Sequence, residues 1–298
     1  MKLSIIIVNY NSGEFLSSCL ASLREFIALS NDKEVFVVDN NSNDGSPSKV
    51  TRDFPWVKLI INHTNLGFAK ANNQALRLAK GEYVLLLNPD TEVPADTLPK
   101  VLEFMEKREE IAALTCRVEL GDGSLDPACH RGFPTPWASF CYFTGLEKLF
   151  PKSRLFGKYH MTWCDLEKPH EIDSPSGCFF LIRRKILEEV GFLDEDYFLY
   201  GEDMDLAFRI KEKGFKIFFY PEAKVIHYKG ISSGVKKATA HLTTATTETR
   251  RLAIKSFFRA NRLFYQKHLA HRYPFIINWF TYLGIWLLEK KSLLGKRI

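Results

Sequence analysis

Short apolar runs alternate with helical periodicity over residues 1–118 of the chain. The runs are rich in β-branched residues and too short for buried helices, so they predict strands. They cover 3–8, 35–39, 57–61, 83–87 and 112–118, and the helical patterns between them cover 12–26, 46–53, 67–79 and 96–108. Strands that are apolar throughout and separated by helices predict an α/β domain, in which helices cover both faces of a parallel sheet.

Residues 119–170 do not continue this alternation, because Gly, Pro and aromatic residues are frequent there and periodicity is weak. This composition is typical of long loops that carry function, with some local structure. Helix and strand patterns resume at 172–228 and complete a predicted main domain at 1–228. The region 229–298 is basic and aromatic, and it is predicted to be a helical appendage.

The net charge of +6 conceals an asymmetry between these two regions. Residues 1–228 carry 27 Lys and Arg against 33 Asp and Glu, a balance of −6. Residues 229–298 carry 14 Lys and Arg against Glu248 and Glu289, a balance of +12. An acidic body with a basic, aromatic tail predicts that the tail meets an anionic partner.

The six cysteines form no CxxC pair, and the first apolar run, 3–8, is too short for a signal peptide. Cysteines in this pattern indicate reduced thiols. The sequence therefore predicts a cytoplasmic protein whose cysteines mostly pack in the core.

Polar residues cluster directly after three of the predicted strands. The clusters are Asn9 to Ser12, Asp39 to Ser46, and Asn88-Pro89-Asp90. Parallel sheets bind ligands beyond the carboxyl ends of their strands. Asn, Asp and Ser also favour helix caps and turns, and this alternative is strong for Asn11, Ser12 and Ser46 taken singly. Three clusters on one edge favour a ligand site.

Six motifs occur in order along the chain: VDNNSNDGS, NLGFAKANN, LLLNPDTEV, SGCFFLIRR, FLYGEDMDLAFRI and VIHYKG. Each motif is weak alone, but the ordered set is specific and covers residues 3–230. In these motifs the chain resembles the inverting GT-A-fold nucleotide-sugar glycosyltransferases of the family 2 type, especially bacterial rhamnosyltransferase-like members. The resemblance implies a Rossmann-like GT-A catalytic domain at 1–228. Neither GxGxxG nor GxxxxGK[ST] occurs, so dinucleotide and P-loop chemistry are not supported.

The resemblance implies a donor-nucleotide site made from the polar clusters and the NLG motif. Its predicted members are Asn9, Tyr10, Asn11, Asp39, Asn41, Asn65, Gly67, Asn88 and Asp90. Asp39 is implied to contact a pyrimidine base, since a carboxylate can accept the ring N–H of a dTDP- or UDP-linked sugar. Tyr10 is predicted to pack on the base or, alternatively, in the core.

A divalent cation, Mn²⁺ or Mg²⁺, is implied by the same resemblance. Asn88-Pro89-Asp90 stands where the family has its metal-binding DxD, and here the first Asp is Asn. An amide oxygen can ligate a hard cation but brings no charge. Asp90 is therefore the predicted ligand, and Asn88 a contact to ribose or water. His227 matches a late metal-site histidine of many relatives; the alternative is a structural histidine.

The sequence Glu202-Asp203-Met204-Asp205 opens a predicted helix that runs to Lys213. The spacing pairs Asp205 with Arg209 at i,i+4 as a structural ion pair. Glu202 and Asp203 lie in the first turn, where carboxylates also favour the helix dipole. The resemblance makes Asp203 the general base for the acceptor hydroxyl, with Glu202 as the second candidate.

Ser176-Gly177-Cys178 precedes a predicted strand at 179–182. A glycine there allows the backbone to approach the donor sugar or the acceptor closely, whereas an ordinary β-bulge is the alternative. These three residues are the predicted contacts to donor sugar or acceptor.

Together these features predict an inverting glycosyltransferase that moves a sugar from a nucleoside diphosphate to a hydroxyl of a glycan or polyprenyl-linked saccharide. A catalytically inactive sugar-nucleotide-binding or scaffold protein is the main alternative, because Asn88 departs from the family pattern. A processive membrane polymerase is disfavoured, since multiple spans and a QxxRW-type motif are missing. Nucleic-acid binding is disfavoured as well, because no readout module precedes the basic region.

The tail has two amphipathic features. Arg251, Lys255, Arg259 and Arg262 recur on one face of a predicted helix, and Ile254, Phe257, Phe258, Phe264 and Tyr265 cover another. The run 275–288 is almost continuously apolar but shorter than the about 20 residues that a membrane span needs. An interfacial anchor on the inner face of the membrane is predicted; a helix pair packed on the domain or across a homodimer is the alternative.

Overall fold

The computed structural model describes residues 1–228 and 247–294. The segment in which the tail was predicted to begin, 229–246, lies outside the described residues. Within the described part, nine strands form one mixed sheet in the order β3-β2-β1-β4-β8-β6-β9-β5, with β7 paired to β9. The strands are β1 (Leu3–Asn9), β2 (Lys33–Asp39), β3 (Val57–Ile61), β4 (Tyr83–Leu87), β5 (Thr91–Glu92), β6 (Ile111–Leu120), β7 (His170–Ile172), β8 (Phe179–Arg183) and β9 (Lys216–His227).

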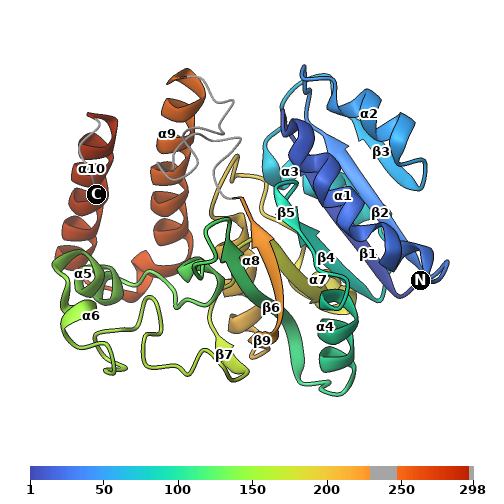
Figure 1. Ribbon diagram of the computed structural model, residues 1–298. Helices are drawn as coiled ribbons and strands as arrows, with labels where there is room; N and C mark the ends of the chain where they lie inside the picture. The colour runs from blue at the N-terminus through green and yellow to red at the C-terminus, as the bar shows by residue number, and fades with distance from the viewer. Residues whose placement is uncertain (229–246, 295–298) are drawn as a thin grey trace.

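Helices lie on both faces of this sheet (Figure 1). In the main domain they are α1 (Gly13–Ala28), α2 (Ser46–Asp53), α3 (Phe68–Leu78), α4 (Thr97–Glu106), η1 (Pro127–Cys129), α5 (Pro136–Thr144), α6 (Leu146–Leu149), α7 (Arg184–Val190) and α8 (Glu202–Glu212). The tail forms α9 (Thr247–Phe264), η2 (Tyr265–Leu269), η3 (Ala270–Arg272) and α10 (Phe275–Leu293).

Four of the five apolar runs of the first 118 residues form inner strands of the sheet, and the fifth, 57–61, is the half-buried edge strand β3. Strand β1 pairs in parallel with β2 and β4, and every side chain of β1 and β4 is buried. Their side chains, with those of α1, α3, α4 and β6, form one hydrophobic core. The predicted α/β architecture is confirmed, because strands buried on both faces need no polar alternation.

Three strands, β5, β7 and β8, run against the parallel direction of the others. Strand β8 is antiparallel to β4 and β6, and both β5 and β7 are antiparallel to β9. The sequence pattern did not predict β5 and β7, because two or three residues are too few to carry a period. The loop-rich character of 119–170 is confirmed, with the short helices α5 and α6 as its local structure.

Helix α9 packs on the main domain through one apolar face. Phe264 and Tyr265 form a cluster with Tyr197, Met204 and Phe208. His268 of η2 also contacts the Asp205 carboxylate at 2.6 Å. On the predicted basic face, Arg251, Lys255 and Arg259 are exposed, whereas Arg262 is half-buried and paired with Glu289. The alternative that the tail packs on the domain is therefore correct for α9.

Helix α10 differs from α9, since it has no buried residue. It is held to α9 and η2 by polar contacts at two points, Arg262 to Glu289 at 2.7 Å and the Tyr265 hydroxyl to Asn278 at 2.6 Å. Across the described ranges 1–228 and 247–294, no helix combines the length and apolar character of a membrane span.

Candidate active site

The carboxyl ends of β1 and β2 bring the first two polar clusters together. Asn9 and Asp39 are register partners, and the Asn9 amide donates to the Asp39 carboxylate at 2.7 Å. The same amide donates to Ser46 Oγ at 2.7 Å, and the other Asp39 oxygen accepts from the Ser42 N–H at 3.0 Å. Both side chains are buried. In the described structure they hold the loop that follows β2, and Asp39 retains lone pairs for a base.

Two asparagines shape the loops around this pair. Asn11 and Asn41 have φ values of 52° and 68°, which asparagine tolerates better than most residues. The Asn11 side chain accepts a hydrogen bond from the Asn43 N–H at 2.9 Å and so locks the β1 loop to the β2 loop. Tyr10 leaves 37% of its surface exposed, so this tyrosine does not pack in the core.

The NLG motif joins the donor-side loops to a distant segment. Asn65 accepts hydrogen bonds from the Asn40 amide at 3.0 Å and from the Gly67 N–H at 2.9 Å. A Cβ on Gly67 would lie 2.6 Å from the Phe198 carbonyl oxygen, and Phe68 N–H donates to that oxygen at 2.7 Å. Gly67 is therefore required by the close approach of the loop before α8, a contact that no sequence pattern indicated.

The end of β4 meets the end of β9. Asp90 Oδ1 lies 3.1 Å from His227 Nε2, and the Asn88 amide nitrogen lies 3.4 Å from the same nitrogen. Asp90 and His227 are both buried, and Thr91 pairs with His227 across β5 and β9. Burial disfavours the charged form of His227, but the Asp90 carboxylate and Cys178 outweigh it and hold the His227 pKa well above its usual value.

These side chains offer a partial ligand set for a cation. In the part of the chain that the structure describes, no group of three His, Cys, Asp or Glu residues is placed to hold a metal. Asp90 and His227 supply a carboxylate oxygen and an imidazole nitrogen, and Asn88 adds an amide. This fits a Mn²⁺ or Mg²⁺ ion that takes its remaining oxygens from a diphosphate and water.

Asp203 stands at the other side of the same edge. Its Oδ2 accepts from the Gly177 N–H at 2.8 Å and lies 3.4 Å from a guanidinium nitrogen of Arg131, and its Oδ1 accepts from the Met204 N–H at 2.7 Å. Cys178 follows Gly177 in the chain, and its carbonyl oxygen accepts a hydrogen bond from the Asn88 N–H at 3.1 Å. Consecutive residues of one loop therefore connect Asp203 to the Asp90 and His227 pair.

Glu202 has a different environment from Asp203. It is buried, and its Oε2 has no hydrogen-bond partner among the described residues. Burial and the neighbouring Asp203 charge raise the Glu202 pKa to about 8. A raised pKa favours the protonated form of the Glu202 carboxyl, and a protonated carboxyl cannot accept the acceptor's proton. This geometry favours Asp203 over Glu202 as the base.

Asp205 is a structural residue, as its spacing predicted. Its carboxylate contacts Arg209 Nε at 2.8 Å and His268 Nε2 at 2.6 Å. The i,i+4 ion pair is confirmed, and the second contact ties the tail to α8.

The predicted Ser176-Gly177-Cys178 contacts divide into two kinds. Ser176 and Gly177 are half-buried beside Asp203, where a Cβ on Gly177 would lie 3.5 Å from Asp203 Oδ2. Cys178 is buried, and its thiol faces His227. Any direct contact of Cys178 with a substrate is thus limited to its backbone.

Arg131 is the functional candidate that the sequence reasoning missed. It lies in the loop-rich segment and also donates to the Pro175 carbonyl at 3.4 Å, while its Nε is buried without a partner among the described residues. Its only sequence signal was a basic residue in an aromatic stretch, which is too common to select it.

Comparison with known proteins decides the family. A sequence profile described as glycosyl transferase family 2 matches residues 4–191, more than half of the chain. The chain belongs to glycosyl transferase family 2. The predicted resemblance is confirmed, and the protein moves a sugar from a nucleotide-sugar donor in glycan biosynthesis.

Two curated relatives of this glycosyltransferase are rhamnosyltransferases. It is 28% identical over 252 residues to the N-acetylglucosaminyl-diphospho-decaprenol L-rhamnosyltransferase of Mycobacterium tuberculosis, covering 80% of each chain. It is 24% identical to the rhamnosyltransferase WbbL of Escherichia coli, covering 75% of this chain and 82% of the relative.

Solved structures of other glycosyltransferases share the fold. The mannosyltransferase PcManGT of Pyrobaculum calidifontis, in complex with GDP-Man and Mn²⁺, has a TM-score of 0.55 at 19% identity and covers 98% of this chain and 87% of that one. GalNAc-T7 with UDP, GalNAc and Mn²⁺ has a TM-score of 0.59 at 18% identity and covers 90% of this chain and 48% of that one. At these identities the likeness establishes the GT-A fold alone.

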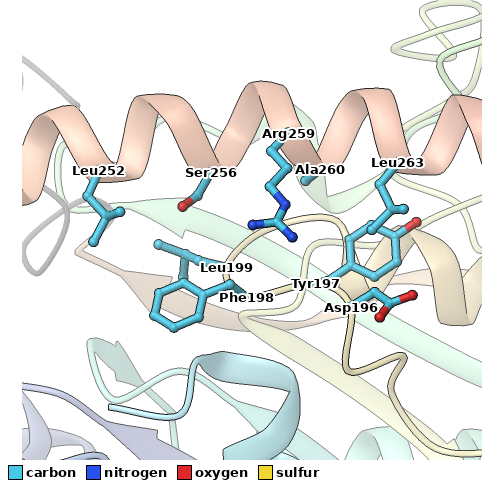
Figure 2. Close-up of a pocket in the computed structure, with 9 residues that line it drawn as sticks. All are labelled: Asp196, Tyr197, Phe198, Leu199, Leu252, Ser256, Arg259, Ala260 and Leu263. Atoms are coloured by element: carbon cyan, nitrogen blue, oxygen red, sulfur yellow. The ribbon is translucent and has the colours of Figure 1, made fainter. Parts of the chain in front are cut away.

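The glycosyltransferase has a pocket of about 260 Å³ between α9 and the loop that leads into α8 (Figure 2). Its lining is Asp196, Tyr197, Phe198, Leu199, Leu252, Ser256, Arg259, Ala260 and Leu263. Arg259 points from α9 toward the loop, and no carboxylate of the described residues pairs with it. Asp196 pairs at 2.6 Å with Lys267, which also pairs with Asp194 at 2.5 Å. The pocket thus combines apolar walls with one guanidinium.

Proposed function

We propose that this glycosyltransferase transfers rhamnose from a dTDP- or UDP-linked donor to a hydroxyl of a polyprenyl-linked saccharide, with inversion at the anomeric carbon, in cell-surface polysaccharide synthesis. The observation that carries the proposal is the Gly177-Cys178 bridge. Gly177 binds the Asp203 carboxylate, and Cys178 binds Asn88 beside Asp90 and His227. Displacement at an anomeric carbon needs a base for the acceptor hydroxyl and a site for the leaving diphosphate, and this loop contacts the candidate residues for both.

In the proposed reaction, Asp203 takes the proton of the acceptor hydroxyl as that oxygen attacks the anomeric carbon. The bond to the nucleoside diphosphate breaks, and the leaving group departs with its electron pair. The two hydrogen bonds from Gly177 and Met204 orient the Asp203 carboxylate, and Arg131 fixes it from a third side. One base and no covalent nucleophile give a single displacement, which inverts the configuration.

Asp90 and His227 are the proposed ligands of Mn²⁺ or Mg²⁺, with Asn88 beside them. When bound, the cation supplies electrostatic stabilisation of the diphosphate charge. The loops after β1 and β2 are proposed to hold the nucleoside, with Asp39 at the base, exposed Tyr10 stacked on it, and Asn9, Asn11, Asn41, Asn65 and Gly67 maintaining the shape of the site.

The pocket beside α9 supports an amphiphilic acceptor. A lipid-linked diphosphate has an apolar chain and an anionic group, and the pocket offers leucine side chains and Arg259. A Cβ on Gly201 would lie 3.1 Å from Ala260 Cβ, so the pocket helix approaches the chain two residues before Asp203. The Mycobacterium relative named for a decaprenyl diphosphate acceptor agrees with this choice.

We place the enzyme on the inner face of the cell membrane. All six cysteines lie in the described part, and none of them forms a disulfide there, which suits a reducing compartment. Helix α10 has no buried residue and exposes Phe275, Trp279 and Trp286, and such a face suits a membrane interface. A homodimer through α10 is the alternative.

A panel of nucleotide sugars tests the donor and the cation together. We expect a dTDP- or UDP-linked sugar to raise the melting temperature with Mn²⁺ and to lose most of this effect in EDTA, because Asp90 and His227 alone bind diphosphate poorly. Transfer and donor hydrolysis are then measured with that donor. Binding without either reaction would favour the inactive sugar-nucleotide-binding alternative.

Replacing Arg259 tests the acceptor pocket. Arg259→Gln is expected to raise the KM for a lipid-linked acceptor roughly tenfold, the loss of one charge-assisted contact, with donor affinity unchanged. Arg251→Gln is the matched control, since Arg251 is exposed on the same helix and does not line the pocket. Equal effects of the two variants would show that Arg259 acts only through the general positive charge of α9 and not as a contact in the pocket.

A further inference from the structure

A second exposed apolar surface lies far from the tail in sequence. Residues 136–158, here called the α5–α6 segment, carry large apolar side chains that face solvent. Their exposure ranges from 42% for Trp137 to 68% for Leu149, and the others are Phe140, Phe143, Phe150 and Leu155. Trp137, Phe140 and Phe143 follow one another at three-residue spacing on one side of α5. A soluble surface rarely gathers so many exposed aromatic side chains in one segment.

The charges of the α5–α6 segment all have one sign at the surface. Lys148, Lys152, Arg154 and Lys158 are exposed, and within 1–228 and 247–294 none of them has a carboxylate partner within 4.0 Å. The single acid of the segment, Glu147, is buried and bonded to His160 at 2.6 Å. The exposed surface therefore consists of aromatic and aliphatic side chains surrounded by uncompensated cations.

We propose that the α5–α6 segment inserts into an anionic lipid surface, and that it forms one membrane-binding surface with α10. Trp, Phe and Leu with flanking Lys and Arg are the composition of interfacial anchors, in which the rings enter the headgroup region and the cations meet lipid phosphates. The role of this surface in catalysis rests on the proposed lipid-linked acceptor, whereas membrane binding itself does not depend on it.

One aromatic cluster connects the two parts of this surface. Phe133, just before α5, contacts Phe208 and Phe264 with ring centroids 4.9 Å and 6.0 Å apart. Tyr265, the residue after Phe264, contacts Tyr282 of α10 at 5.4 Å. The residue just before α5 and the middle of α10 thus contact the same aromatic cluster, and Figure 1 shows the two helices at the same end of the molecule.

A bilayer fits the charge pattern better than a second copy of the chain. A two-fold contact would bring the same patch of four cations against itself, and like charges facing each other repel. Lysine is also depleted from the cores of protein interfaces. Anionic headgroups neutralise these cations, and the acyl region accepts the apolar side chains.

The α5–α6 segment lies next to the proposed base, so its insertion into a membrane would affect where the reaction takes place. Both ends of the segment close beside the base, because Gly132 N–H donates to the Tyr159 carbonyl at 2.8 Å and Arg131 contacts Asp203. Insertion of α5 and α6 would fix Arg131 and Asp203 at the height of the lipid headgroups. An acceptor carried by a membrane lipid presents its saccharide at that height.

The test is flotation of the full-length enzyme with vesicles of phosphatidylcholine mixed with phosphatidylglycerol, at low and high salt. The double variant Phe143→Ser/Leu149→Ser is expected to lower the bound fraction at least about fivefold at both salt concentrations, because apolar insertion is not screened. Leu29→Ser/Leu78→Ser is its matched control, since these two leucines are 75% and 55% exposed and stand at the ends of α1 and α3, helices on the other side of the molecule from α5 in Figure 1. The control should bind as the wild type does.

A second pair of variants tests the charges. Lys148→Gln/Lys152→Gln is expected to lower binding about threefold or more at low salt and to have little effect at high salt, where screening has already weakened the attraction. Lys213→Gln/Lys216→Gln, two exposed lysines without an ion pair among the described residues, is the matched control.

Several outcomes would overturn the proposal. Wild-type enzyme that stays off anionic vesicles, or an apolar variant that binds as well as its control, contradicts it. A dimer on size-exclusion chromatography that Phe143→Ser/Leu149→Ser dissociates would assign the surface to a second copy. Donor hydrolysis without vesicles must equal the wild type, which shows that the variant is folded. Vesicle binding without any transfer to a lipid-linked acceptor would contradict the proposed acceptor but would still support the membrane-binding surface.

Discussion

Asp203→Asn is expected to lower the rate of transfer by at least about 10²-fold while the donor still binds, since general-base catalysis contributes on that scale. Asparagine keeps the shape of the side chain and can still accept the Gly177 N–H through its oxygen. It cannot take the acceptor's proton. Single-turnover transfer and donor affinity, measured on the same preparation, separate the chemical step from binding.

Glu202→Gln is the control for the Asp203 experiment. Because burial and the neighbouring Asp203 charge raise the pKa of Glu202, the protonated carboxyl is favoured, and glutamine resembles that form. The Glu202→Gln enzyme should therefore retain much more activity than Asp203→Asn. Near wild-type turnover in Asp203→Asn would show that the base is wrongly assigned, and Glu202 would become the candidate.

Asp90→Ala and His227→Ala are each expected to weaken Mn²⁺-dependent donor binding by roughly tenfold or more, the scale of losses at metal sites. The two side chains lie 3.1 Å apart, so they are proposed to share one ligand sphere. The double variant should then lose less than the sum of the two single losses in free energy. Donor affinity is measured across a Mn²⁺ titration for all three variants.

Asn88→Asp is expected to strengthen Mn²⁺-dependent donor binding, the opposite of the effect of Asp90→Ala and His227→Ala. The Asn88 amide lies 3.4 Å from His227, and a carboxylate there would restore the charge that the family pattern has at this position. We expect this variant to need less Mn²⁺ for half-maximal donor binding, because a second carboxylate favours a divalent cation. His227→Ala with an unchanged Mn²⁺ dependence would return His227 to a structural role beside Asp90.

Melting temperatures without metal complete this experiment. His227 is buried, and its Nε2 lies 3.1 Å from the Asp90 carboxylate. Asp90→Ala therefore leaves a buried imidazole without that partner. A loss of stability in the absence of Mn²⁺ would measure this structural contribution. The effect on Mn²⁺ affinity is then read at temperatures well below the transition.

Local pattern was sufficient for the longer strands and the helices of the first 118 residues, but not for the two-residue strand β5. The apolar run that became β4 is buried at every position, and the helix predicted at 46–53 is α2 with the same bounds. Asp205 and Arg209 pair because i and i+4 are neighbours on any α-helix. The ordered motifs predicted the family, and the family carried the GT-A fold with it.

Contacts between distant segments were decided by the tertiary structure. Arg131 reaches Asp203 across 72 residues, and no periodicity relates them. Gly67 must be glycine because the Phe198 carbonyl approaches it, a cause that lies in another loop. Helix α9 packs on α8 through Phe264, and Tyr265 of η2 joins the same cluster, whereas α10 is the more apolar of the two tail helices and yet buries no side chain.

The sequence by itself determined which segments are buried strands and amphipathic helices, because burial of an apolar face imposes a period on the chain. Only the tertiary structure decided which polar side chains meet at the sheet edge, that β8 runs antiparallel beside β4, and which apolar faces remain uncovered. These features depend on the closure of long loops and on packing between whole elements. Such interactions leave no regular spacing in the sequence, since each involves residues that are far apart along the chain.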